Sequence, residues 1–221
     1  MGLGGRLIVI EGPGHVGRSL HCRLLANRLE AHGVAVAHIG LARSQLLGEL
    51  IKSNNAEIHQ LNWRTRSLLY ATDLHDQIRH EIEPLLGAGF VVIADRYTLT
   101  PIVREEVRNG DTEWIKQLYS GVPVPDMSVI LHAGPRRLLN RILFGEELQA
   151  LNHFEAGMDI TNTASITSSF LTYQRRIRRA FLAHGEEAGH PMIATRDSVQ
   201  QVHEEIWSHV LPIVGPMLQP V

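Results

Sequence analysis

The chain has 221 residues and a hydrophobic fraction of 44%, which suits one α/β domain with a full core better than two small domains. With 21 basic and 23 acidic residues its formal charge is −2, so it lacks the basic excess that binding duplex nucleic acid through its phosphates requires. Nineteen of the basic residues are arginine, and only Lys52 and Lys116 are lysine. Any mechanism that needs a lysine therefore has two candidates.

The single cysteine, Cys22, excludes an internal disulfide and a cluster of cysteine metal ligands, and such cysteine usage is typical of a reducing compartment. The first apolar run, residues 7–10, ends at Glu11 and is too short for the core of a signal peptide. No run approaches the roughly 20 apolar residues of a membrane helix. We expect a cytoplasmic protein with neither a membrane nor a nucleic acid as partner.

Short apolar runs rich in branched residues predict strands that are buried on both faces of a parallel sheet. Four such runs cover residues 7–10, 34–39, 90–94 and 127–131, and a weaker fifth covers residues 192–194. Segments with helical spacing separate them. The alternation predicts a three-layer α/β fold with a five-stranded parallel sheet, whose ligands bind at the carboxyl ends of the strands.

The segments between and after these strands predict helices. Apolar residues recur between 22 and 29, and Gly33 lies where a helix needs a left-handed cap. A long helix is predicted over residues 61–85, and Pro135 opens another helix after the fourth strand. A less regular stretch is followed by two final helices around residues 170–181 and 199–210. Because we find no repeat or linker, we expect one domain over residues 1–221.

A glycine-rich turn follows the first strand and opens the first helix. Residues 12–19, Gly-Pro-Gly-His-Val-Gly-Arg-Ser, have the spacing of a phosphate-binding loop, with Arg18 in the place of the usual lysine. Such a loop binds phosphate oxygens through backbone N–H groups and the helix N-terminus, while its hydroxyl reaches Mg²⁺. Arg18 keeps the charge but is planar and larger, so it either contacts phosphate from a displaced position or obstructs the loop.

Two other interpretations of this turn stay open. Gly12, Gly14 and Gly17 also fit the dinucleotide-binding pattern, but the segment after the second strand supplies no acidic residue for the ribose, and only Arg43 could meet a 2′-phosphate. The turn could also be a structural glycine turn without a ligand. We take the phosphate loop as the working interpretation, because Ser19 is well placed for it.

Asp95 and Arg96 come directly after the third strand, beside the glycine-rich turn if the first and third strands are neighbours. A carboxylate in this position can hold Mg²⁺ or its waters, and an arginine can bind a phosphate with two hydrogen bonds. The alternative is a charged pair that only begins a solvated loop.

With these residues the sequence resembles the thymidylate kinase family of nucleoside monophosphate kinases. The order and spacing of several segments carry the resemblance over almost the whole chain. They are residues 7–20, the Leu-Leu-Tyr-Ala-Thr-Asp of residues 68–73, Asp95-Arg96-Tyr97, Pro125-Asp126, Arg141, Phe154-Glu155 and residues 178–181.

The resemblance implies a phosphate-loop nucleoside-kinase fold, frequent homodimers, and transfer of a phosphoryl group from ATP with Mg²⁺ to thymidylate. It also implies a short lid at about residues 143–161. By the resemblance, ATP is bound by Gly12, Gly14, His15, Val16, Gly17, Arg18, Ser19 and Leu20. Ser19 and Asp95 hold the metal, Arg18, Asp95, Arg96 and Arg141 serve catalysis, and Tyr70, Asp73, Arg96 and Tyr97 bind the acceptor.

The chain departs from the family pattern at positions that carry chemistry. Gly14 stands where the family has an acidic residue near the acceptor sugar, Leu74 where an arginine reads the base, and Arg104 where the family has a tyrosine. Together with Arg18 they leave two hypotheses. The chain is an active kinase with Arg18 in place of lysine, or a kinase-like protein that binds a nucleotide or a protein partner and catalyses little.

Overall fold

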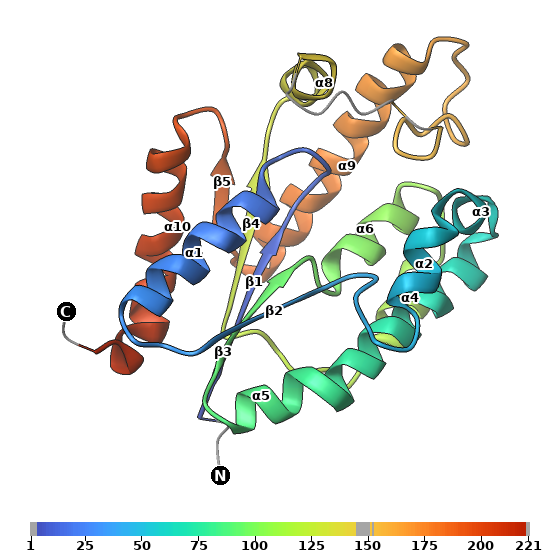
Figure 1. Cartoon of the computed structure of the whole chain (residues 1–221). Coiled ribbons are helices and arrows are strands. Elements are labelled where there is room, and N and C mark those ends of the chain that lie inside the picture. The colour runs from blue at the N-terminus through green and yellow to red at the C-terminus, as the bar shows by residue number, and fades with distance from the viewer. Residues whose placement is uncertain (1–3, 145–150, 152, 220–221) are drawn as a thin grey trace.

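The computed structural model describes residues 4–144, 151 and 153–219 (Figure 1). Its strands are β1 Arg6–Glu11, β2 Val36–Gly40, β3 Val91–Asp95, β4 Met127–His132 and β5 Met192–Ala194. Its helices are α1 Arg18–Ala31, α2 Gly48–Ser53, α3 Asn55–Gln60, α4 Trp63–Gln77, α5 Glu83–Gly87, α6 Leu99–Glu106, α7 Thr112–Leu118, α8 Pro135–Phe144, α9 Ile166–Ala188 and α10 Val199–Val214. All five predicted strands are confirmed.

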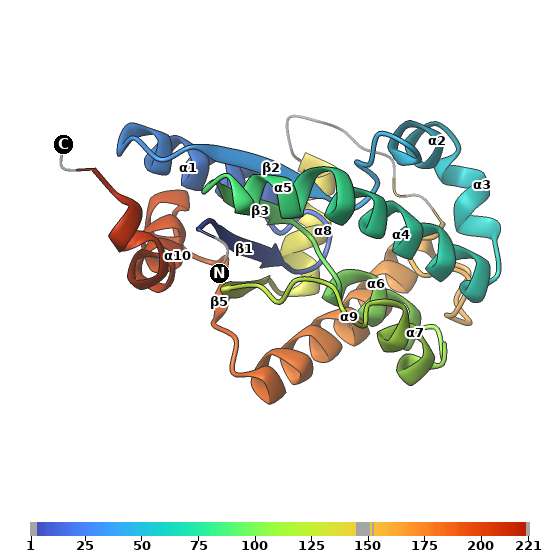
Figure 2. The same ribbon diagram turned by 90° about the horizontal axis from the view of Figure 1, so that it is seen from below.

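The strands form one parallel sheet with the order β2-β3-β1-β4-β5. Successive residues of β1 enter different hydrophobic clusters: Ile8 and Ile10 pack with α1 and α10, whereas Leu7 and Val9 pack with α4 and α5. Both faces of the sheet are therefore covered, with α1 and α10 on one side and α4, α6, α7 and α9 on the other (Figure 2). The predicted three-layer arrangement is confirmed.

The strand order brings the two strongest sequence motifs together. β1 pairs with β3 so that Ile10 lies opposite Asp95, and the N–H of Arg96 donates to the carbonyl of Ile10 at 3.1 Å. The turn after β1 and the turn after β3 therefore share one edge of the sheet. This is the edge at which parallel sheets bind their ligands.

Several helices differ from the sequence prediction. The long helix predicted over residues 61–85 is α4 and α5, joined by a π-helical turn at Ile78–Ile82. Helices α2, α3, α6 and α7 were not predicted, because each has only six to eight residues. No helix within the described residues is long and apolar enough to cross a membrane.

The predicted lid at residues 143–161 is described only in part, since residues 145–150 and 152 lie outside the described residues. In the rest of it Phe154 and Ala156 are buried. The side chain of Arg108 in the loop after α6 donates to the Phe154 carbonyl at 2.8 Å and pairs with Asp159 at 2.7 Å. These contacts attach the described part of the segment to the loop after α6.

A pair of buried histidines lies between α1 and α10. The rings of His21 and His203 stack with centroids 6.1 Å apart, and neither Nδ1 atom has a hydrogen-bond partner among the described residues. Burial, together with the charges of His203 and Arg141, lowers the pKa of His21 to about 4. His21 is therefore neutral in the folded chain at neutral pH.

This pair should make the fold sensitive to acid. Above pH 6.5 His21 is mostly neutral in both the folded and the unfolded chain. Below pH 6.5 His21 becomes protonated in the unfolded chain, but in the folded chain it stays neutral down to about pH 4. We expect His21 to contribute a loss of about 2 kcal/mol in the free energy of unfolding between pH 7 and pH 5. Urea titrations of the wild type and His21→Leu at both values measure this contribution. An equal loss in the two proteins would contradict it.

Candidate active site

The glycine-rich loop has the backbone conformation of a tight anion-binding turn. Gly12 and Gly17 have φ values of 138° and 102°, and a Cβ atom at Gly12 would lie 2.2 Å from the carbonyl oxygen of Leu131. A side chain is therefore excluded at Gly12. Helix α1 begins at Arg18 without a side-chain cap, so the N–H groups of its first turn face the loop and can bind an anion.

Arg18 turns its guanidinium group into the loop and towards Asp95. Its Nε donates to Asp95 Oδ1 at 2.9 Å, and its Nη1 donates to the carbonyls of Gly12, at 2.9 Å, and Pro13. The side chain is only 8% exposed. In this structure Arg18 thus holds the shape of the loop and neutralises Asp95.

The two predicted metal ligands touch each other. The Ser19 hydroxyl, in the first turn of α1, donates a short hydrogen bond to the second carboxylate oxygen of Asp95, and Arg43 Nη2 lies 3.7 Å from the same oxygen. Burial by itself would raise the pKa of Asp95, but Arg18, the Ser19 hydroxyl and Arg96 outweigh it, so this pKa is lowered. Asp95 is therefore a carboxylate at neutral pH.

A carboxylate and a hydroxyl side by side at a phosphate loop fit Mg²⁺ that arrives with a nucleotide, because Mg²⁺ keeps several waters and takes one or two protein ligands beside the phosphates. No cluster of three or more histidine, cysteine or acidic side chains suited to a metal occurs in the described part of the chain. The donor set around Ser19 and Asp95 thus suits a metal shared with a substrate.

Arg96 is held in an unusual backbone conformation by Glu11. Its φ is 75°, which is costly for a residue with a side chain and needs support from its surroundings. One buried oxygen of Glu11 accepts hydrogen bonds from the N–H groups of Tyr97, Leu99 and Thr100, at 2.9 to 3.3 Å. This role of Glu11 was not predicted, although an acid at the end of a buried strand was its signal.

Arg141 on α8 contacts the outer side of the loop. Its Nη1 donates to the carbonyls of His15 and Val16 at 3.1 and 3.0 Å, and its Nη2 donates to the carbonyl of Thr195 at 3.1 Å. In this conformation Arg141 ties the loop to the segment after β5. The catalytic role implied for Arg141 remains a prediction, because such a role needs its guanidinium to leave these carbonyls.

The remaining loop residues have different surroundings. Val16 is buried in the core, and Leu20 is 36% exposed on α1. His15 has a φ of 58°, and its Nε2 lies 3.9 Å from a carboxylate oxygen of Glu155 in the lid segment. A Cβ atom at Gly14 would meet nothing within 4 Å. The loop is therefore open at Gly14, and His15 connects it to the lid segment.

Three of the residues that the resemblance assigns to the acceptor are buried. Asp73 is 0% exposed and accepts hydrogen bonds from the N–H groups of Ala42 and Ser44, at 2.7 and 3.0 Å. The Tyr97 hydroxyl donates to the carbonyl of Pro123, and Tyr70 packs in a cluster with α2 and α3. In this conformation Asp73 and Tyr97 support the walls of the site instead of lining it.

A buried ion pair connects α4 and α6 behind the site. Arg66 Nε and Nη2 donate to the two carboxylate oxygens of Glu105, both at 2.6 Å, and the two side chains are 5% and 4% exposed. Arg66 Nη1 donates to the carbonyls of His59 and Leu61. The sequence carries no pattern that joins Arg66 to Glu105, so this pair could not be predicted.

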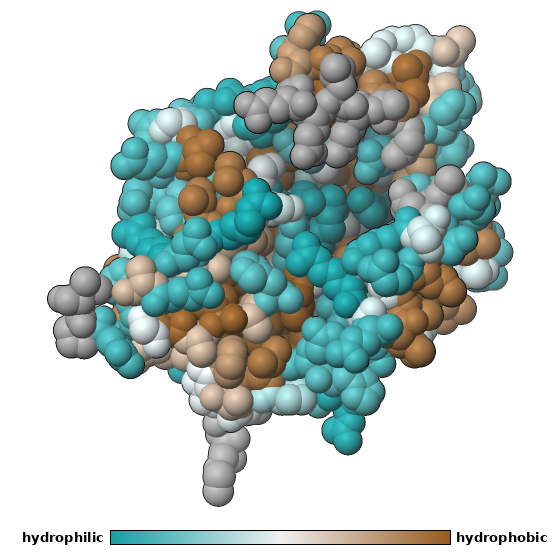
Figure 3. Space-filling model, in the orientation of Figure 1, coloured by the Kyte–Doolittle hydropathy of each residue, from teal (hydrophilic) through white to brown (hydrophobic). Residues whose placement is uncertain are grey.

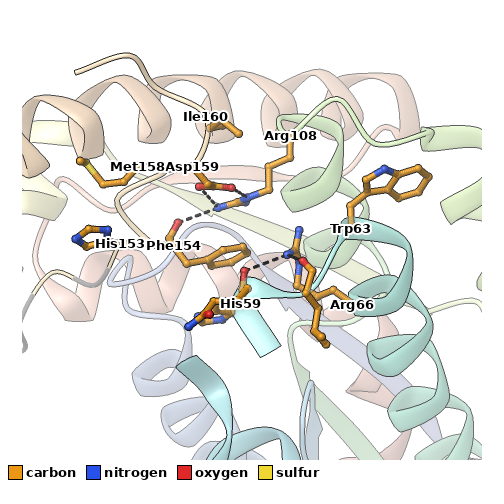
Figure 4. Close-up of a pocket in the computed structure, with 11 residues that line it drawn as sticks. His59, Trp63, Arg66, Arg108, His153, Phe154, Met158, Asp159 and Ile160 are labelled. Carbon is orange, nitrogen blue, oxygen red and sulfur yellow. Dashed lines mark hydrogen bonds and ion pairs between the residues drawn. The ribbon is translucent and has the colours of Figure 1, made fainter. Parts of the chain in front are cut away.

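Next to this ion pair is a cavity of about 920 Å³ between α3, α4 and the lid segment (Figure 4). The Phe154 ring stacks on His59 with centroids 4.0 Å apart, and the guanidinium of Arg108 lies 3.6 Å from its centre. Figure 4 shows the Phe154 ring between Arg108 and His59, with Arg66 beside it. The lid segment is thus packed against α3 by its aromatic side chain.

Hydrophilic side chains gather in a hollow between α1 and α2, where the loop and the turn after β3 meet (Figure 3). A parallel sheet with an anion-binding loop after its first strand, and an adjoining hydroxyl and carboxylate, defines a phosphate-loop protein of the nucleotide-binding class. Comparison with known proteins specifies the class further. The family model described as thymidylate kinase matches residues 10–206.

Curated relatives and a solved structure agree with that match. A probable thymidylate kinase 2 of Saccharolobus solfataricus is 35% identical over 173 residues, covering 78% of this chain and 79% of the relative. The thymidylate kinase of Schizosaccharomyces pombe is 33% identical over 65% of this chain and 68% of its own length. The structure of a thymidylate kinase from Candida albicans is similar in fold, with a TM-score of 0.71, 19% identity, and coverage of 95% of this chain and 92% of that one. The chain belongs to the thymidylate kinase family.

Proposed function

We propose that this chain transfers the γ-phosphoryl group of ATP to thymidylate. The observation that carries the proposal is the contact between the Ser19 hydroxyl and the Asp95 carboxylate at the mouth of the glycine-rich loop. This contact puts the two side chains suited to Mg²⁺ within reach of phosphates bound at the N-terminus of α1. Membership of the thymidylate kinase family supports ATP as donor and thymidylate as acceptor.

In this proposal the residues of the chain position the reactants and stabilise charge. The amides of the loop and of the first turn of α1 bind the donor phosphates, and Arg96 binds the acceptor phosphate on the other side of Asp95. Mg²⁺, held by Ser19 and Asp95, would supply positive charge to the transferred phosphoryl group. Glu11 keeps Arg96 in place through the turn that follows it.

Arg18 must exchange partners for this reaction. In this structure its charge is neutralised by Asp95 at 2.9 Å, whereas a metal at Asp95 would repel it. We propose that phosphate oxygens replace Asp95 as the partner of the guanidinium when ATP and Mg²⁺ bind. The long arginine side chain makes this exchange possible without movement of α1.

The same contacts favour a second candidate function. Arg18 already donates hydrogen bonds to Asp95 and to two loop carbonyls. These hydrogen bonds must break before Arg18 can move to the phosphates, and a lysine in its place would have fewer of them to break. A chain in which Arg18 stays bound to Asp95 would bind a nucleotide with little catalysis. It would then act as a nucleotide-dependent binding protein.

Measurement of ADP release distinguishes an active kinase from a nucleotide-binding protein with little catalysis. With ATP, Mg²⁺ and a panel of nucleoside monophosphates, we expect ADP release that is fastest with thymidylate, in a coupled assay. Arg18→Lys should retain or raise this rate, because the ammonium group suits the loop. Binding of ATP in a calorimetric titration, combined with no ADP release from either protein with any acceptor, would favour the nucleotide-binding function and contradict the kinase.

We further propose that the chain forms a homodimer and works in a reducing compartment such as the cytoplasm. Exposed leucines on and near α2 and α4, Leu46, Leu50 and Leu68, support an apolar contact between two copies. The single cysteine, Cys22, is buried, and burial raises the pKa of its thiol. A protonated, buried thiol needs no oxidising environment.

A further inference from the structure

A small cavity lies between the glycine-rich loop, the end of α6 and the lid segment. Gly14 and His15 line it from the loop, Arg96 and Arg104 from the turn after β3 and from α6, and Glu155 from the lid segment. Its volume is about 30 Å³, which is room for about one water molecule. The cavity thus brings together two arginines and one carboxylate beside the loop.

The two half-buried arginines lack ion pairs such as those that Arg18 and Arg66 form. Among residues 4–144, 151 and 153–219, neither Arg96 nor Arg104 has a carboxylate within 4.0 Å, and Arg96 makes only a 3.3 Å hydrogen bond to Thr100 Oγ1. Burial and the charges of Arg18 and Arg104 lower the pKa of Arg96. Two neighbouring guanidinium groups without their own counter-ions repel each other, and an anion that binds both removes this cost.

Glu155 supplies part of the missing negative charge. Its carboxylate oxygen Oε2 lies 3.9 Å from Nε2 of His15, and the residue lines the same cavity as the two arginines. Its interaction with His15 and the charges of Arg104 and Arg96 together lower the pKa of Glu155 to about 2, against the effect of burial. Glu155 is therefore fully ionised at neutral pH, and one carboxylate balances one of the two arginine charges.

We propose that Arg104 joins Arg96 in binding the phosphate of the acceptor nucleotide, and that this phosphate replaces Glu155 as their counter-ion. The proposal rests on the proposed function, because it assigns the acceptor end of that site. The phosphate of a nucleoside monophosphate carries nearly two negative charges at neutral pH and matches two guanidinium groups better than a carboxylate does.

Because the cavity is small, the acceptor phosphate can bind there only if the Glu155 carboxylate leaves. A cavity of about 30 Å³ has no room for a phosphate group while Glu155 stays in it. Departure of the carboxylate makes room, and the open space at Gly14 allows the phosphate to approach the loop. Because Glu155 belongs to the lid segment, binding of the acceptor would also release the contact between that segment and His15.

Gln174 on α9 adds a feature that suits a nucleotide more than inorganic phosphate. It is 5% exposed, and its Oε1 has no hydrogen-bond partner among the described residues although it lines the same cavity. A buried acceptor atom of this kind calls for a donor from the ligand. A sugar hydroxyl or a base N–H supplies such a donor, whereas the ionised oxygens of a phosphate only accept hydrogen bonds.

Calorimetric titration of the full chain with thymidylate, without ATP, tests the proposal through binding alone. We expect Arg104→Met to weaken thymidylate binding about 10- to 100-fold, which is the range for a charge-assisted hydrogen bond. Glu155→Gln should strengthen binding, because it removes the competing carboxylate. Arg176→Met, which removes an exposed arginine from the same helix as Gln174, is the matched control and should leave affinity unchanged.

The measured affinities of the wild type and the variants can each overturn one part of the proposal. Unchanged affinity in Arg104→Met would overturn it, provided that far-ultraviolet circular dichroism and thermal melting show a folded variant. Weaker binding in Glu155→Gln would overturn the exchange of counter-ions. A wild type that binds neither thymidylate nor inorganic phosphate would overturn the arginine pair as an acceptor site. Binding with these variant effects but without ADP release would support the pair and contradict the kinase activity instead.

Discussion

Asp95→Asn is expected to abolish most phosphoryl transfer and to destabilise the fold at the same time. The substitution removes the carboxylate that pairs with Arg18 at 2.9 Å and accepts from the Ser19 hydroxyl, and it leaves Arg18 as a buried charge without a counter-ion. We expect a loss of about 10²- to 10³-fold in turnover. The free energy of unfolding should fall by about 3 kcal/mol. Coupled ADP release and urea titration measure the two effects.

Asp126 provides the matched control for this substitution. It lies at the opposite edge of the sheet, just before β4, where it accepts from the N–H of Leu7 at 2.8 Å and is 35% exposed beside Arg6. Asp126→Asn should leave turnover unchanged and cost less than about 1 kcal/mol, because an exposed ion pair contributes little. Equal effects of the two substitutions would show that Asp95 has no special role.

Arg66→Met is expected to be the most destabilising substitution outside the loop. Arg66 and Glu105 form two hydrogen bonds of 2.6 Å with both side chains almost fully buried. Removal of the arginine leaves the Glu105 carboxylate buried without a partner, so we expect a loss of about 3 to 5 kcal/mol in the free energy of unfolding. Urea titration at pH 7 measures this loss.

The double substitution Arg66→Met with Glu105→Leu distinguishes charge from packing. It removes both charges and keeps apolar volume between α4 and α6, so most of the lost stability should return. A double variant that is as unstable as Arg66→Met would show that packing, and the contacts of Arg66 with the carbonyls of His59 and Leu61, cause the loss.

The sheet and the loop could be predicted because their signals are local. A strand that is buried on both faces needs a continuous apolar run, and residues 7–10 and 90–94 have one. Gly12 and Gly17 occupy φ values that other residues avoid, so their spacing reveals the turn directly. The position of Asp95 beside the loop followed from one assumption, that the first and third strands are neighbours, and the strand order confirms it.

The contacts that complete the site could not be predicted, because they join residues far apart in the chain. Nothing in the sequence shows that Glu11 receives the N–H groups that follow Arg96, or that Asp73 supports the segment after β2. The direction of the Arg18 side chain depends on the loop carbonyls and on Asp95 together. A residue type at a motif position therefore predicts the chemistry available, but not the partner that it has in the folded chain.

Arg18 distinguishes this site from a phosphate loop that has the usual lysine. A lysine contributes one compact charge to a phosphate loop, whereas Arg18 can donate to the loop carbonyls and to Asp95 at once. With Arg96 and Arg104 nearby, the site gathers more positive charge than Asp95 and Glu155 balance. Such a surplus favours ligands with several phosphate groups.

The central claim is that a phosphate loop with an arginine in place of lysine still transfers a phosphoryl group to thymidylate. Incubation of the wild-type chain with ATP, Mg²⁺ and thymidylate, followed by chromatographic separation of the nucleotides, tests it most directly. We predict that thymidine diphosphate and ADP form in equal amounts and that Asp95→Asn forms neither at a comparable rate. No thymidine diphosphate from the wild type would contradict the claim, and its formation by Arg18→Lys alone would show that the arginine prevents the transfer.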